Sequence, residues 1–239
     1  MNMVYLRTEV LRVFRNKRVL IFSLVMPAMM LLLIGGTSVN DADGRAYVMV
    51  SMGLFGAMNA AIGSGGQIAV ERGLGWNRTL RLTTLTPRAY VLGKVVLALL
   101  IAIPPLVVTF AVGAFGLHVS LDPGVWALVF LGSWLSSLPF AMLGLVIGYL
   151  ARPDSIQQVS GLLYIGLAAL GGLWVPVEAM PHAMRTVASF TPTYWAGQVA
   201  RSPLFHGHLD PKSVLVLAAW TLALGIVALR RFRVDTARV

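Results

Sequence analysis

Few residues in this sequence have the types and spacing that chemistry requires. His206 and His208 form a His-x-His pair close to Asp210, a pattern that can bind a metal ion. The pair is short, and no second set of ligands lies near it, so we expect no metal site. No Ser, His and Asp residues are arranged for nucleophilic catalysis. The sequence therefore predicts no catalytic residue.

Gly93 and Lys94 look like the end of a phosphate-binding loop, but the loop is incomplete. A Walker A loop has Ser or Thr after its lysine and a first glycine five residues before the second. This chain has Val95 and Arg88 at those positions. We therefore expect no cofactor in this chain. If ATP powers the protein, the ATPase is a separate chain, which would hold the ATP and Mg.

Charged residues are missing from the long apolar parts of the chain. Six stretches contain no Asp, Glu, Lys or Arg: 19–40, 46–70, 95–121, 123–151, 155–177 and 213–229. A bilayer core needs about 20 apolar residues per helix, and a charge at the centre costs about 2.5–3.5 kcal/mol. The sequence predicts an all-α polytopic membrane protein whose single domain, residues 1–239, has six transmembrane helices. We place them at about 19–40, 46–70, 92–115, 125–150, 156–177 and 213–229.

Composition and charge support this interpretation. Hydrophobic residues make up 57% of the chain and the mean hydropathy is +0.79, both high for a soluble domain. A net charge of +10 could indicate nucleic acid. However, most Lys and Arg residues lie in alternate connections, and only four lie on the other side: Arg45, Arg185, Arg201 and Lys212. This positive-inside pattern predicts cytoplasmic N and C termini, a bilayer as the partner, and no nucleic acid.

Two flanking segments are expected at the membrane surface. Residues 1–18 have an apolar and a basic face, which predicts an interfacial amphipathic helix, although a solvated basic leader that only fixes orientation would explain the charges too. Residues 178–212 are rich in proline, and their charge-free part is too short to span. We predict external re-entrant or interfacial pieces there.

The spans offer only neutral candidates for a substrate path. His118, near one end, is the only His, Asp, Glu, Lys or Arg in their charge-free stretches, and this disfavours a proton-coupled secondary transporter. Met30, Asn59, Gln67 and Gln158 are the candidates for the path. Methionine adapts to varied apolar ligands, but ordinary packing would also explain it. Hydrogen bonding between helices would equally explain the amides.

Small residues and prolines recur within the spans. Gly144 and Gly148 form a small-xxx-small pair of the kind that lets two helix backbones approach closely. The pair could serve packing within the chain or dimerisation. Pro139 lies inside the fourth span and is expected to kink it.

The most specific segment is the connection 71–94, ERGLGWNRTLRLTTLTPRAYVLGK. Its apolar positions alternate with arginines, so a short helix here could dock into a groove of a partner protein. A solvated loop that serves topology alone is the simpler alternative. The segment 171–201, GGLWVPVEAMPHAMRTVASFTPTYWAGQVAR, is the second distinctive stretch.

With these two segments in this span order, the chain resembles ABC-2 type permeases, the membrane subunits of bacterial ABC exporters related to daunorubicin-resistance permeases. The resemblance covers nearly the whole chain. It implies that the segment after Glu71 is a coupling helix, and the residues expected to couple the chain to an ATPase are Glu71, Arg72, Trp76, Arg78 and Arg81. Family loops often carry more acidic residues after this glutamate than this chain does.

The resemblance also implies partners and a function. Two permease subunits, identical or paired siblings, would work with two ATPase subunits in the inner membrane of a bacterium. The complex would export a hydrophobic or amphipathic substrate such as a drug, a natural product or a lipid-like molecule, with antibiotic resistance as one outcome. A membrane scaffold that recruits a cytosolic partner is the alternative from another class, followed by a secondary transporter.

Overall fold

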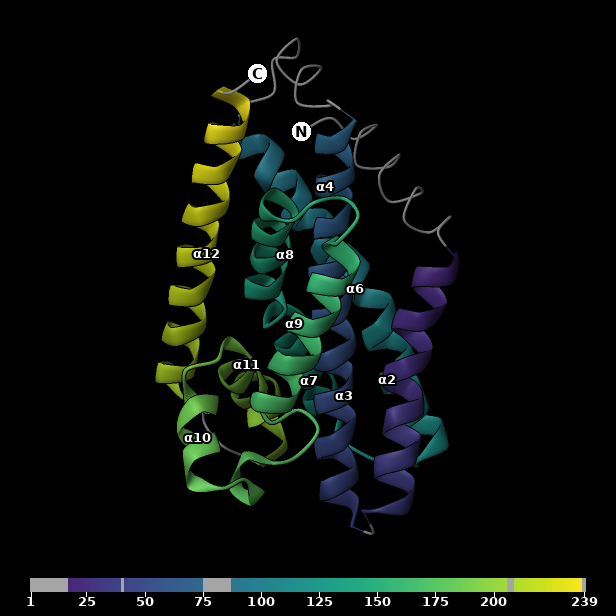
Figure 1. Cartoon of the computed structure of the whole chain (residues 1–239). Coiled ribbons are helices and arrows are strands. Elements are labelled where there is room, and N and C mark those ends of the chain that lie inside the picture. The colour runs from purple at the N-terminus through teal and green to yellow at the C-terminus, as the bar shows by residue number, and fades with distance from the viewer. Residues whose placement is uncertain (1–16, 40, 75–86, 206–208, 238–239) are drawn as a thin grey trace.

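The protein is a bundle whose long helices lie side by side and extend from one end of the bundle to the other (Figure 1). The structure is a computed structural model, which describes residues 17–39, 41–74, 87–205 and 209–237. Every regular element in those ranges is a helix. They are α2 (Lys17–Thr37), α3 (Ala42–Gly63), α4 (Gly65–Gly73), α6 (Pro87–Gly116), α7 (Pro123–Leu135), α8 (Leu138–Leu150), α9 (Ile156–Leu170), η1 (Val177–Ala179), α10 (His182–Ser189), α11 (Pro192–Arg201), η2 (Ser202–Phe205) and α12 (Pro211–Ala237).

Helix α3 is the centre of the bundle. It begins at a cap in which the Asp41 carboxylate accepts a hydrogen bond from the Gly44 N–H at 2.8 Å. Beyond its first turn most of its residues are buried, and it packs against α2, α6, α7, α8, α9 and α11. A helix that is apolar on every side belongs in the interior of a protein. Phe55 illustrates this, with its ring between those of Tyr164 and Trp174 at 5.6 Å from each.

Glycines bring α4 and α8 into backbone contact. A Cβ added at Gly65 would lie 1.9 Å from the Gly144 carbonyl oxygen, and one added at Gly148 would lie 2.4 Å from the Gly65 carbonyl oxygen. Only residues without side chains permit this approach. The small-xxx-small pair Gly144 and Gly148 therefore serves packing within the chain.

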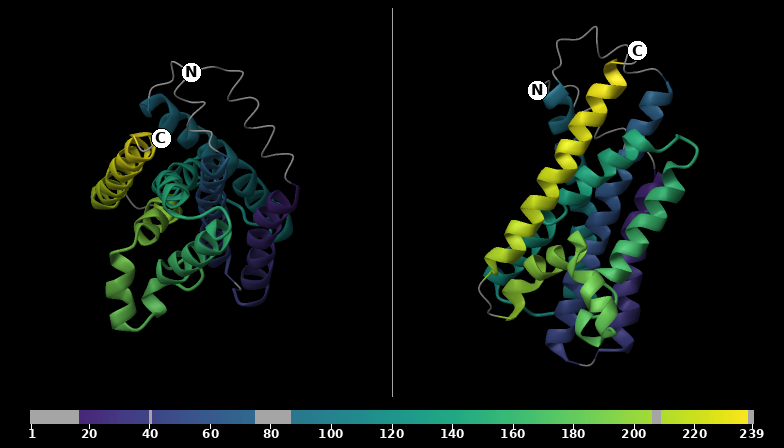
Figure 2. Two further views of the ribbon diagram at one scale, coloured as in Figure 1. Left: turned by 45° about the horizontal axis from the view of Figure 1, so that its top comes forward. Right: turned by 60° about the vertical axis from the view of Figure 1, so that its left-hand side comes forward.

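The apolar helices confirm an all-helical polytopic membrane protein. Four stretches of the described residues are long and apolar enough to cross a membrane: Ala42–Gly73, Tyr90–Gly116, Pro123–Leu150 and Pro211–Phe232. The apolar stretches Ser23–Thr37 and Ile156–Leu170 are shorter. Helix α12 lies at the edge of the bundle, alongside α8 (Figure 2). The predicted interfacial helix, residues 1–18, lies almost entirely outside the described residues.

Several boundaries differ from the predicted spans. The second span is divided at Ser64 into α3 and α4, and the fourth is divided at 136–137 into α7 and α8. Pro139 follows this second break, as expected of a residue that cannot donate a backbone hydrogen bond. The third and sixth helices begin earlier than predicted, at Pro87 and Pro211, because proline is favoured in the first turn of a helix.

The fifth helix, α9, ends at Leu170 instead of 177. Gly172 has φ of +79°, a conformation that favours glycine, and the Leu173 N–H donates to the Ala168 carbonyl at 3.1 Å. This six-to-one hydrogen bond is the Schellman motif that closes many helices. The chain beyond it forms η1, α10, α11 and η2 at the same end of the bundle as the connection between α2 and α3 (Figure 1).

Candidate functional site at the connection between α4 and α6

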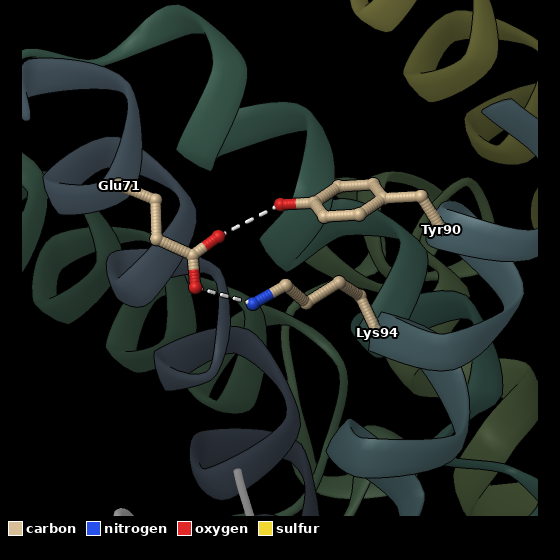
Figure 3. A network of polar contacts seen from close by, with 3 residues as sticks. All are labelled: Glu71, Tyr90 and Lys94. Carbon is tan, nitrogen blue, oxygen red and sulfur yellow. Dashed lines mark hydrogen bonds and ion pairs between the residues drawn. The ribbon is translucent and has the colours of Figure 1, made fainter. Parts of the chain in front are cut away.

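Glu71, near the end of α4, is the centre of a buried polar cluster (Figure 3). Its Oε1 lies 2.6 Å from Lys94 Nζ, and its Oε2 accepts a hydrogen bond from the Tyr90 hydroxyl at 2.8 Å. Glu71 is 8% exposed, and Tyr90 and Lys94 are 4% exposed each. Both carboxylate oxygens of Glu71 are therefore engaged within the protein interior.

Local sequence places the two partners of Glu71. Pro87 begins α6, so Tyr90 and Lys94 lie in its first two turns. They are four residues apart, and residues at this spacing share one face of a helix. The Lys94 ammonium also lies 5.5 Å from the centre of the Tyr90 ring. Helix α6 thus presents a cation and a hydroxyl together toward α4.

The main effect of the Glu71–Lys94 ion pair is to hold α4 and α6 in one relative position, and its net contribution to the free energy of unfolding is small. Moving two charges out of water costs several kcal/mol per ion, and the attraction between them offsets that cost only when the geometry is good. Removing one member of a buried pair usually costs about 3–5 kcal/mol. The pair therefore penalises any arrangement that separates α4 from α6.

Arg72 extends the cluster to α8 and α12. Its Nη1 donates to the Gly148 carbonyl at 3.1 Å, and its guanidinium lies 6.0 Å from the centre of the Tyr149 ring. Phe232 of α12 lies 5.2 Å from the Tyr90 ring and 6.2 Å from the Tyr149 ring, centre to centre. These contacts join the ends of α4, α6, α8 and α12. We call them the junction, and its residues are Glu71, Arg72, Tyr90, Lys94, Gly148, Tyr149 and Phe232.

The predicted coupling residues divide into two groups. Glu71 and Arg72 belong to the junction, whereas Trp76, Arg78 and Arg81 lie outside the described residues. The segment that carries these three residues connects α4 to α6, and the Glu71–Lys94 ion pair joins those two helices. A force applied to the connection would reach both helices together.

The predicted substrate-path residues are dispersed over four helices, α2, α3, α4 and α9. Met30 of α2 packs at the edge of the main core, and Asn59 of α3 is half-buried. Gln67 of α4 has a buried side-chain oxygen with no hydrogen-bond partner in the described ranges. Gln158 of α9 is exposed, and with its amide nitrogen assigned to the side that faces the Ser155 and Asp154 carbonyls it donates to both at 3.1 Å. None of the four lines the cavity formed by Tyr47, Gln198 and Arg201.

Sequence reasoning assigned no site role to Tyr90 or Lys94. Lys94 was counted among the cytoplasmic charges that set topology, yet it is buried inside α6. A signal was present, because Pro87 predicts a helix start and the four-residue spacing then places a cation and a hydroxyl on one face. The described residues contain no group of three His, Cys, Asp or Glu able to hold a metal ion.

The fold is that of a polytopic membrane protein. Its 75–86 connection joins α4 and α6, and the Glu71–Lys94 ion pair links these two helices. The family model described as "ABC-2 type transporter" matches residues 2–205. A relative from Bacillus subtilis (strain 168), named "Putative transport permease YvfS", is 31% identical over 219 residues, which cover 90% of this chain and 89% of the relative.

The chain therefore belongs to the ABC-2 type transporter family. Permeases of this family generally work with ATPase subunits, and their membrane domain is not itself catalytic. The resemblance stated from the sequence is confirmed. Family membership supports the function of a transport permease and does not identify the substrate.

Proposed function

We propose that this chain is the membrane permease subunit of an ATP-driven ABC exporter in a bacterial inner membrane. It has six membrane-crossing helices and both termini in the cytoplasm. A separate ATPase binds the ATP and Mg, and a second permease subunit, identical or a sibling, completes the transporter. The observation that carries this proposal is the Glu71–Lys94 ion pair, which joins the two helices that flank the 75–86 connection.

The junction suggests how motion passes from the ATPase to the membrane helices. An ATPase that pushes on residues 75–86 would displace α4 and α6 together, because separating them would break a buried ion pair. The contacts of Arg72 with α8, and of Tyr90 and Tyr149 with Phe232, would carry the displacement to α8 and α12. Such a mechanism requires two states whose balance ATP shifts.

The proposed cargo is hydrophobic or amphipathic, and export from the cell is the proposed direction. Support comes from the apolar spans and from the resemblance to drug-resistance permeases. Resistance to a toxic compound would be one consequence of such export. Met30, Asn59, Gln67 and Gln158 stay candidates for contacts with cargo on different segments of the bundle.

The test is recovery of the ATPase with the full chain from membranes of the source organism. We expect a stoichiometric ATP-binding protein with the wild type. The double variant Arg78→Glu, Arg81→Glu should reduce recovery about tenfold, since losing charged contacts of about 1.4 kcal/mol has that effect. The matched control is Arg230→Glu, Arg231→Glu, which makes the same charge change on exposed residues of α12.

Three results would contradict the proposal. Isolation of the wild type without an ATPase would favour a membrane scaffold. Flux driven by an ion gradient in proteoliposomes of the chain alone would favour a secondary transporter. Equal recovery of the ATPase with both double variants would remove the coupling role of the 71–94 connection.

A further inference from the structure

A second buried cation lies at the opposite end of the bundle from Glu71. Arg201, the last residue of α11, is 4% exposed. Its Nη1 donates to Ser51 Oγ at 3.0 Å and to the Gly172 carbonyl at 3.4 Å, and its guanidinium lies 4.4 Å from the centre of the Tyr47 ring. A Cβ at Gly197 would lie 2.6 Å from Nη2, so this glycine makes room for the guanidinium.

Arg201 has no carboxylate partner among the residues that the structure describes. Among the described residues, the guanidinium lies within ion-pair distance of no Asp or Glu, and its hydrogen bonds all begin at Nη1. Burial lowers the pKa of Arg201, while nearby Tyr47, Glu178 and Tyr194 oppose that change. Arginine stays protonated in proteins, so a positive charge with unused donors is held in the interior.

Arg201 lines a cavity of about 440 Å³, a volume within the range of small-molecule sites. Tyr47 of α3 and Phe205 of η2 supply aromatic surface, and their ring centres are 6.5 Å apart. Gln198 adds an amide without a hydrogen-bond partner in the described ranges. The wall thus combines apolar surface with a few polar groups, as ligand sites usually do.

The same cavity carries two carboxylates at exposed positions, Glu178 and Asp210. Asp210 is partly used, because its Oδ1 accepts from the Lys212 N–H at 3.0 Å and its Oδ2 from Ser213 Oγ at 3.2 Å. The side chain of Glu178 makes no hydrogen bond or ion pair within the described ranges. A buried cation is therefore combined with acidic groups at the exposed part of the cavity.

We infer that this cavity binds a small zwitterionic group, with a phosphate or carboxylate on Arg201 and an ammonium beside Glu178 and Asp210. The guanidinium matches oxyanions through paired N–H donors. The exposed carboxylates would repel a simple anion and attract the ammonium of a zwitterion. The ligand could be a phosphoethanolamine lipid headgroup or a soluble zwitterion of the same chemistry. In the proposed topology the cavity faces the outside, and binding there does not require ATP or the junction.

Binding can be measured on the purified full chain with three soluble probes: glycerophosphoethanolamine, glycerol 3-phosphate and ethanolamine. We expect the zwitterion to bind, and we expect glycerol 3-phosphate and ethanolamine, which each carry charge of one sign only, to bind at least about tenfold more weakly. Glu178→Gln should weaken the zwitterion about tenfold and improve glycerol 3-phosphate. Because Glu178 is exposed, this variant should fold normally. Asp122→Asn, an equal charge change on an exposed residue that does not line the cavity, is the matched control.

A second binding experiment, with lipids, shows whether the ligand is a lipid headgroup or a free solute. Native mass spectrometry would compare retention of phosphatidylethanolamine and phosphatidylglycerol by the wild type and by Glu178→Gln. Preference for phosphatidylethanolamine that Glu178→Gln abolishes would support a lipid headgroup, and binding of the soluble probe alone would support a free solute. Equal binding of anionic and zwitterionic probes, no binding of either, or unchanged selectivity in Glu178→Gln would overturn the inference.

Discussion

At the scale of single residues, the two oxygens of Glu71 have different partners, and substitution can separate them. Tyr90→Phe removes one hydrogen bond to a charged group and should cost about 1.5–3 kcal/mol. Glu71→Gln removes the carboxylate from a buried lysine and should cost more, about 3–5 kcal/mol. Unfolding of both variants in detergent would test this order. A Tyr90→Phe cost equal to or above that of Glu71→Gln would show that the ion pair contributes no more to stability than the hydrogen bond from Tyr90 does.

The ion pair can also be replaced as a unit. Apolar residues of similar volume often substitute for a buried pair without loss, so Glu71→Leu with Lys94→Met should unfold closer to the wild type than either single variant does. The coupling energy from the double-mutant cycle should therefore exceed the cost of either single variant, which is about 3–5 kcal/mol for removing one member of a buried pair. Additive losses in the same unfolding assay would mean that Glu71 and Lys94 act independently, contrary to the 2.6 Å contact.

At the scale of helices, the close backbone contact between α4 and α8 predicts that alanine is destabilising at Gly65 and stabilising at Gly63. A Cβ at Gly65 would lie 1.9 Å from the Gly144 carbonyl oxygen, so Gly65→Ala must push the helices apart. Overpacking of this kind typically costs about 1–3 kcal/mol. Gly63→Ala is the matched control because nothing lies within 4 Å of its added Cβ, and alanine favours a helix by about 0.5–1 kcal/mol. Opposite shifts in melting temperature are expected, and shifts of the same sign would contradict the packing described.

The same contrast shows what sequence can and cannot predict. Absence of charge over long stretches correctly predicted an all-helical polytopic membrane protein because burying charge in a bilayer is costly. Gly144 and Gly148 were recognised as a close-packing pair, but their spacing alone could not say that the partner backbones belong to the end of α3 and to α4. Breaks at Ser64 and at 136–137 were missed because apolar composition continues through both.

Charged residues were harder to place than apolar ones. Lys94 and Arg201 looked like solvent-facing markers of topology, and both are 4% exposed. Their burial depends on partners far away in the chain, Glu71 for Lys94 and Ser51 for Arg201. Hydropathy averages carry no information about such pairs. Only the fold brings them together.

At the scale of the whole molecule, the two polar clusters occupy opposite ends of the bundle. The junction lies where α4 ends, and the Arg201 cavity lies beside α11 and the start of α12 (Figure 1). If both termini are cytoplasmic, the junction faces an ATPase and the cavity faces the outside. A change in the position of α12 would affect both clusters, since Phe232 contacts Tyr90 and Ser213 lines the cavity.

This orientation can be tested directly because the chain contains no cysteine. Leu74, after α4, is 77% exposed, and Phe190, between α10 and α11, is 74% exposed. In intact cells a membrane-impermeant maleimide should label Phe190→Cys and spare Leu74→Cys until the membrane is permeabilised, and the cysteine-free parent gives the background. The reverse pattern would place both termini outside, with the 71–94 connection beyond the reach of a cytoplasmic ATPase. Labelling of both variants from one side would contradict the arrangement of α4 and α10 at opposite ends, because a membrane separates those ends only when the helices between them span it.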